Sequence, residues 1–217
     1  MTRILSTKKL SKALKNKLSD AKIELVEKNF IQTKSIDFET PQLNDYLIFT
    51  SKEAVKSVLK SETKNVLSKS CLCVGSKTRS FLEKKGFTVL ESADYAEELI
   101  QIIESKYKTN SFTFFCGNIR RNTIPAFFQQ NKIAYNEIVV YETKLKPHQI
   151  KESFDGVLFY SPSGVNSFLE NNTLGNKTCF CIGTTTAKAL ENETKNIVIA
   201  SQPTVEHVID EVIKYYK

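Results

Sequence analysis

The chain has 217 residues, 41% of them hydrophobic and 25% charged, which fits one large or two small globular domains. No apolar run reaches the ~20 residues of a membrane helix, which excludes a spanning protein, and the first ten residues lack the apolar stretch of a secretory signal. The formal net charge of +7 favours an anionic partner.

Short β-rich runs alternate with helical patterns along the whole chain. Before residue 44 the pattern predicts a strand at 3–7, a helix through 10–18 and a strand at 23–25. It then predicts strands beginning at 47, 71, 89 and 111, each followed by a helix, and a strand at 133–135. Beyond residue 147, strands beginning at 157, 179 and 199 are again each followed by a helix. This alternation is typical of parallel sheets with helices on both faces.

The chain also repeats itself with an offset of 110 residues, which falls to 108 where a short deletion intervenes. The matched pairs are 47–57 with 157–167, 71–78 with 179–186, and 111–135 with 3–25. Because the last partner lies at the N-terminus, the repeat is circularly shifted. One domain must then be contiguous and the other split.

The repeat therefore predicts an α/β protein of two similar lobes, each a parallel β-sheet flanked by helices. The split lobe is expected at 1–30 plus 147–217 and the contiguous lobe at 44–135. Residues 31–43 and 136–146 alternate in strand fashion and are expected to form a two-stranded antiparallel connector. We expect a cleft between the lobes, with the ligand at the carboxyl ends of the strands.

Small hydroxyl residues and glycines follow the predicted strands, and each loop leads into a helix whose free N–H groups favour anions. With Lys77 and Arg121 nearby, the loops together favour a ligand with several anionic groups. The candidate binding residues are Thr50, Ser51, Gly75, Ser76, Thr78, Gly117, Asn118 and Arg121 in the contiguous lobe, and Ser161, Ser163, Gly164, Gly183, Thr184, Thr185, Thr186, Pro203 and Thr204 in the split lobe. The alternative is that Ser51, Ser161, Thr185 and Thr204 are only helix caps.

Other kinds of site find little support. These loops hold no GxGxxG or GxxxxGK[ST] motif, which disfavours a dinucleotide or P-loop site. His148 and His207, the two histidines, are expected on the surface, and no Ser-His-Asp arrangement is present. The cysteine pairs at 71 and 73 and at 179 and 181 lie inside apolar strands, so we expect core packing and no metal. Five cysteines without a signal peptide predict free thiols in a cytoplasmic protein.

In this order and spacing, the loops resemble those of the uroporphyrinogen-III synthase family. The matching segments are 158–165, 182–187, 201–204 and 139–143, with 48–51, 74–78 and 117–121 in the contiguous lobe. The resemblance spans nearly the whole chain. Thr184, Lys52 and Glu53 depart from the family pattern, and so does the N-terminal 5–9 segment, which lacks an Arg-Pro pair.

The resemblance implies a two-lobed monomer without a cofactor that acts on the linear octacarboxylate hydroxymethylbilane. The terminal hydroxyl would leave to give an azafulvene, and attack at ring D with rearrangement through a spiro intermediate would invert that ring. Tyr141 is the implied aid to hydroxyl departure, and its alternative role is a hinge tyrosine packed against a lobe.

Three rival functions remain at this point. A non-catalytic two-lobed binding or sensor protein would use the same kind of cleft. A tetrapyrrole methyltransferase would need a glycine-rich cofactor loop, which we do not find in the sequence. A nucleic-acid or membrane partner is not expected, because the basic residues form no stripe.

Overall fold

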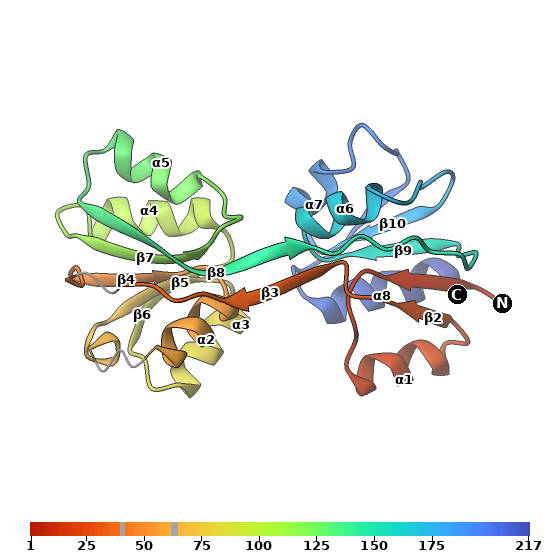
Figure 1. Cartoon of the computed structure of the whole chain (residues 1–217), viewed down its shortest axis with the longest axis horizontal. Helices are drawn as coiled ribbons and strands as arrows, with labels where there is room; N and C mark the ends of the chain where they lie inside the picture. Colours follow the sequence, from red (N-terminus) through yellow and green to blue (C-terminus); the bar gives the residue numbers. More distant parts are fainter. Residues whose placement is uncertain (40–41, 62–64) are drawn as a thin grey trace. The chain divides into compact units, whose positions relative to one another are not determined.

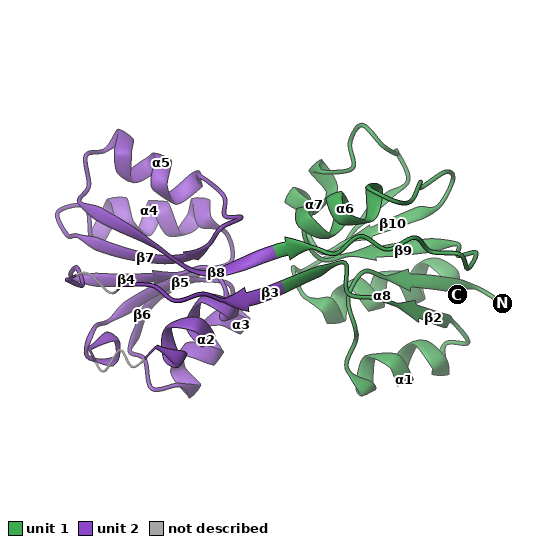
Figure 2. Cartoon of the chain, viewed as in Figure 1, with its two compact units in different colours: residues 1–32, 144–217 green, residues 33–143 purple. Residues whose placement is uncertain are grey.

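The computed structural model describes residues 1–39, 42–61 and 65–217. The chain divides into two compact units, which Figure 2 colours separately: unit 1 is Met1–Gln32 with Lys144–Lys217, and unit 2 is Thr33–Thr143. It passes from one unit to the other twice, within β3 (Ile31–Ser35) and within β8 (Tyr135–Leu145). Among the described residues, no helix has the length and apolar character needed to cross a bilayer.

Unit 2 contains a six-stranded sheet in the order β3-β8-β7-β4-β5-β6. From β8 to β6 all neighbouring strands are parallel. The remaining strands are β4 (Tyr46–Phe49), β5 (Cys71–Val74), β6 (Val89–Ala93) and β7 (Phe112–Gly117); the helices are α2 (Lys52–Lys60), η1 (Val66–Ser68, a 3-10 turn), α3 (Ser76–Lys84), α4 (Ala96–Lys106) and α5 (Thr123–Gln130).

The two faces of this sheet are covered by different helices, as Figure 1 shows. Leu47 and Phe49 of β4 pack against residues of α2 and α3 in one core cluster. Ile48, between them, packs against residues of α4 and α5 in another. This is the period-two alternation of a strand buried on both faces.

Unit 1 contains a five-stranded parallel sheet in the order β11-β10-β9-β1-β2. Its strands are β1 (Arg3–Ser6), β2 (Glu24–Glu27), β9 (Gly156–Phe159), β10 (Thr178–Cys181) and β11 (Ile197–Ile199); its helices are α1 (Lys12–Asp20), α6 (Pro162–Leu169), α7 (Thr184–Lys188) and α8 (Val205–Tyr216). Leu5 packs in a cluster with residues of α6 and α7, whereas Ile4 packs with residues of α1 and α8.

The two sheet orders confirm the α/β fold and the circular repeat. From β2 to β11, unit 1 has the order β2-β1-β9-β10-β11, and unit 2 has β8-β7-β4-β5-β6. The 110-residue offset carries β4 onto β9 and β1 onto β7. One boundary differs from the prediction: the helix expected through 10–18 begins at Lys12, so Leu10 precedes α1.

The segment predicted as a separate connector is part of the unit 2 sheet. Residues 135–145, which the prediction divides between a strand at 133–135 and a connector at 136–146, form the single strand β8. No glycine or proline interrupts residues 135–145, so nothing in the sequence ends the strand. β3 lies beside β8, where Ile36 N donates to Val140 O and Lys146 N donates to Phe30 O. Because one residue number falls as the other rises, this pair is antiparallel.

Candidate active site

In unit 2 the carboxyl ends of three neighbouring parallel strands bring most of the predicted binding residues together. Thr50 and Ser51 follow β4, Gly75 and Ser76 follow β5, and Gly117 ends β7. Thr50, Ser51 and Gly75 are half-buried and Ser76 is exposed. Since the ends of parallel strands meet at one edge of a sheet, this edge presents hydroxyls beside the first residues of α2 and α3.

Tyr141 reaches this edge from β8. Ser51 Oγ donates to Tyr141 Oη at 3.2 Å and also accepts from Ala54 N, so that it caps α2. Burial raises the pKa of the Tyr141 hydroxyl above its usual 10.0, although the hydrogen bond from Ser51 opposes this shift. The phenol is therefore neutral at physiological pH. Because its oxygen accepts from Ser51, its own hydrogen can be directed to another acceptor.

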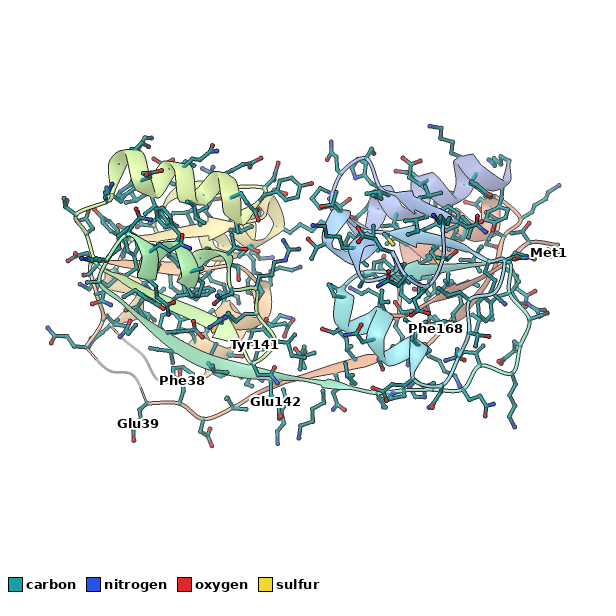
Figure 3. The ribbon with its side chains drawn as sticks, turned by 90° about the horizontal axis from the view of Figure 1, so that it is seen from above. Met1, Phe38, Glu39, Tyr141, Glu142 and Phe168 are labelled. Carbon is teal, nitrogen blue, oxygen red and sulfur yellow. The ribbon has the colours of Figure 1, made fainter. Side chains whose placement is uncertain are left out.

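The ring of Tyr141 lies against the backbone of Gly117. A Cβ atom at residue 117 would come within 2.5 Å of Tyr141 Cζ, far inside van der Waals contact. Figure 3 shows Tyr141 and Glu142 on opposite sides of the β8 ribbon. Tyr141 thus packs against its own unit, which was the alternative role predicted for it, and also presents its hydroxyl at the strand ends.

Asn118 and Arg121, in the loop between β7 and α5, differ in whether hydrogen bonds hold them to a strand. Asn118 is bound to β8: its N–H donates to Tyr141 O, and its Oδ1 accepts from Thr143 N at 2.8 Å. Arg121 is exposed. Its neighbour Arg120, which the sequence did not single out, pairs with Glu137 at 2.9 Å.

A shallow pocket of about 320 Å³ lies next to this edge, between the first residue of α2 and one side of α3. We call it the lysine pocket, and its lining residues are Lys52, Ser76, Lys77, Ser80, Phe81 and Lys84. Among the described residues that line it there is no carboxylate. Three lysine side chains and the ring of Phe81 in one pocket suit a ligand with carboxylates on short alkyl arms.

Unit 1 repeats the arrangement at the carboxyl ends of β9, β10 and β11. Ser161 Oγ caps α6 by accepting from Gly164 N, and Thr204 Oγ1 caps α8 by accepting from His207 N. The other predicted residues of this edge are Ser163, Gly183 and Thr185, which are half-buried, Gly164, which is buried, and Thr184 and Pro203, which are exposed.

The helix-cap interpretation is confirmed for Ser51, Ser161 and Thr204, whose side chains each accept a backbone N–H. It is wrong for Thr185, the second residue of α7, because Gly183 occupies the cap position. A cap uses one lone pair of the hydroxyl oxygen, and Ser51 donates its hydroxyl hydrogen in turn to Tyr141.

Thr78 and Thr186 are the third residues of α3 and α7 and hold equivalent places in the two units. Both are buried, and each N–H donates to the carbonyl of the preceding loop glycine, Gly75 or Gly183. Both residues are therefore less accessible to a ligand than their neighbours Ser76 and Thr184, which are exposed.

A scan against protein-family models places residues 12–210 in the family described as "Uroporphyrinogen-III synthase HemD". The chain belongs to the uroporphyrinogen-III synthase family. This family cyclises hydroxymethylbilane in haem biosynthesis, and the chain is accordingly an enzyme of that class. The comparisons give no support to the non-catalytic alternative.

Relatives of the synthase family agree with this assignment. The chain is 28% identical over 211 residues to "Uroporphyrinogen-III synthase" of Saccharomyces cerevisiae, covering 80% of this chain and 77% of the yeast protein. The crystal structure of uroporphyrinogen-III synthetase from Helicobacter pylori matches with a TM-score of 0.72 at 22% identity, covering 99% of this chain and 100% of that one. A mutant uroporphyrinogen III synthase of Thermus thermophilus matches with a TM-score of 0.71 at 12% identity, covering 99% and 98%. These two structures support the fold alone.

A second tyrosine, for which the sequence predicts no role, lies at the strand ends of unit 1 in this synthase-family chain. Tyr160, directly after β9, lies within hydrogen-bond distance of Ser6 at 3.0 Å between the two oxygens, and burial raises its pKa. Ser6 in turn donates to Lys8 O, and Thr7 Oγ1 donates to Leu158 O. Ser6 and Tyr160, like Thr7 and Leu158, lie about 150 residues apart in the sequence, so no local motif could have revealed these contacts.

The cysteines are free and buried, as predicted. Burial raises the pKa of Cys71 and Cys179 to about 12, which keeps these thiols neutral. Within residues 1–39, 42–61 and 65–217 no group of three potential metal ligands occurs.

Both histidines are half-buried, and each contacts a neighbouring side chain. His148 packs edge-on against Phe30, and His207 Nδ1 lies 2.6 Å from Thr204 Oγ1.

Proposed function

We propose that this chain closes hydroxymethylbilane to uroporphyrinogen III and that Tyr141 assists departure of the terminal hydroxyl. The observation that carries the proposal is the Ser51–Tyr141 hydrogen bond at the strand ends of unit 2, with a phenol that burial keeps protonated. Because Ser51 donates to it, the phenol can direct its own hydrogen toward the leaving oxygen.

The reaction asks little proton chemistry of the protein. The lone pair of the terminal pyrrole nitrogen expels hydroxide, and the pyrrole N–H proton balances it, so that water leaves and an azafulvene remains. A neutral phenol donor lowers the barrier by stabilising the charge that develops on the departing oxygen. Attack at the substituted carbon of ring D, rearrangement through the spiro intermediate and loss of a proton then complete the macrocycle. Holding the substrate in the geometry for this closure is the larger contribution.

We assign the carboxylates of the substrate to the strand-end edges of the two sheets. In unit 2 the groups are Thr50, Ser51, Gly75, Ser76 and Arg121, together with the lysine pocket. In unit 1 they are Ser161, Ser163, Gly164, Gly183, Thr184, Thr185, Pro203 and Thr204. Backbone N–H groups at the starts of α2, α3, α6 and α8 and the ammonium groups would bind the acetate and propionate arms.

The remaining expectations stand as part of the proposal. The reaction needs no cofactor, because the substrate supplies its own electrons. We also propose a monomer that acts in the cytoplasm, in accord with five free, buried cysteines.

A coupled assay tests the proposal. Hydroxymethylbilane is generated in situ, the protein is added, the products are oxidised, and the type I and type III isomers are separated. We expect predominantly type III isomer, with type I in the control without protein. Type I alone from folded protein would refute the synthase assignment, and binding of uroporphyrinogen without turnover would favour a sensor.

A further inference from the structure

Two consecutive residues of β8 pack on the same face of the unit 2 sheet. Val140 and Tyr141 both belong to the core cluster formed with α2 and α3, whereas Val139 packs in the cluster on the opposite face. In a regular strand, Tyr141 would lie on the face of Val139. The register explains the exception, because Cys116 pairs with Val139 but Gly117 pairs with Tyr141, leaving Val140 as an extra residue. This is a β-bulge, and it turns Tyr141 toward Ser51.

Gly117 provides the space into which the bulge turns the ring. A Cβ atom there would lie 2.6 Å from Tyr141 Cε2 and 2.9 Å from its Oη. Such contacts are too short for any side chain, so residue 117 must be glycine while the ring keeps this position.

Asn118 then fastens β8 on the far side of the bulge. Its backbone N–H donates to Tyr141 O at 3.1 Å, its Oδ1 accepts from Thr143 N at 2.8 Å, and its Nδ2 lies 3.4 Å from Thr143 O. β7 ends at Gly117, so the amide side chain of Asn118 continues the pairing that the strand no longer provides.

We propose that Asn118 and Gly117 are positioning residues for Tyr141 and do not contact the substrate through their polar groups. The three features act together. The bulge places Tyr141 on the α2–α3 face of the sheet, and Gly117 leaves space for its ring. Asn118 holds the backbone on both sides of Glu142. This assignment replaces the substrate contacts that the sequence predicts for these two residues. It rests on the proposed role of Tyr141 in ring closure.

The decisive comparison is between Asn118→Asp and Asn118→Ala. Aspartate keeps the acceptor for Thr143 N and alanine removes it. Positioning predicts that kcat falls about 10- to 100-fold in Asn118→Ala, with KM little changed, and stays closer to wild type in Asn118→Asp. If Asn118 instead donated to a substrate carboxylate, aspartate would repel it, and Asn118→Asp would raise KM above that of the alanine variant. That order would overturn the proposal.

A second measurement does not depend on catalysis. Amide hydrogen exchange at Thr143 should quicken in Asn118→Ala and stay slow in Asn118→Asp; equal exchange in the two variants would contradict the fastening role. If wild-type protein yields no type III isomer, the proposed function fails, whereas the exchange result still tests the geometry.

The role of Gly117 is tested by a double-variant cycle. Gly117→Ala should lower kcat about 10- to 100-fold and destabilise the wild-type background, because the methyl group displaces the ring. In a Tyr141→Leu background the ring is absent, and the same substitution should cost much less stability. Equal destabilisation in both backgrounds would refute the contact as the reason for the glycine.

Discussion

Replacing Tyr141 by phenylalanine removes one oxygen and leaves the rest of the arrangement in place. The ring keeps its contact with Gly117 and with the α2–α3 cluster, and Ser51 still caps α2 by accepting from Ala54 N. Only the hydrogen bond from Ser51 and the phenol donor disappear. The variant therefore separates the hydroxyl's chemistry from the packing of the ring.

The expected losses of stability and rate differ enough to be told apart. A neutral buried hydrogen bond contributes ~1 kcal/mol, so Tm should fall by roughly 2–4 °C for a chain of this size. The free energy of unfolding of a typical domain is ~5–15 kcal/mol, so after such a loss more than roughly 99% of the protein stays folded. Removing a proton donor to a leaving group lowers kcat by about 10²- to 10⁴-fold, equivalent to roughly 3–5 kcal/mol.

The isomer-resolved coupled assay measures kcat, and thermal melts measure stability. Tyr160→Phe is the matched control, because it removes a buried phenol bonded to Ser6 in unit 1. It should lower Tm by a similar amount and leave kcat unchanged. Wild-type turnover in Tyr141→Phe, or an equal loss in both variants, would refute the role given to Tyr141.

Three further outcomes concern charge, acid and thiols. Replacing Lys52 and Lys84 by alanine should raise KM about 3- to 30-fold and weaken its salt dependence, while kcat stays unchanged; an unaltered KM would remove the lysine pocket from substrate binding. Hydrogen bonds from Ser111 lower the pKa of Asp45 below 3.8, so its stabilisation is complete above that pH and is lost as the pH falls through the lowered pKa. Urea melts of Asp45→Asn should therefore show a weaker loss of stability in acid than wild type, and parallel curves would contradict this. Burial holds all five thiols neutral, so alkylation at pH 8 should require unfolding; rapid labelling of native protein would show an accessible thiolate.

The fold could be predicted because the sequence pattern that specifies it repeats along the chain. The alternation of short β-rich runs with helical patterns, together with the 110-residue offset, predicted which segments form strands and which form helices. The extent of β8 was not predicted, because the segment was divided into a lobe strand and a connector although no residue there interrupts pairing. That the two segments form one strand is visible only from the neighbouring strands β7 and β3, which pair with it.

The candidate site was predictable only where it depends on local chemistry. Hydroxyl residues after strands become helix caps because a free N–H lies three residues away, and Ser51, Ser161 and Thr204 follow this rule. The turn of Tyr141 toward Ser51 depends on a bulge, which is a property of register between two strands. The Tyr160–Ser6 contact likewise joins distant segments, so both escape a reading of adjacent residues.

The order of the strands in unit 1 bears on how the protein is synthesised. β1 lies between β2 and β9, and β9 begins about 150 residues after β1 ends. At ~5–20 residues per second the ribosome needs about 8 to 30 s to supply that partner. Unit 2, which is contiguous, is complete in the nascent chain before then. Until β9 emerges, Ile4 and Leu5, which are fully buried in the folded protein, lie on an unpaired strand edge that is open to mispairing and to chaperone binding during translation.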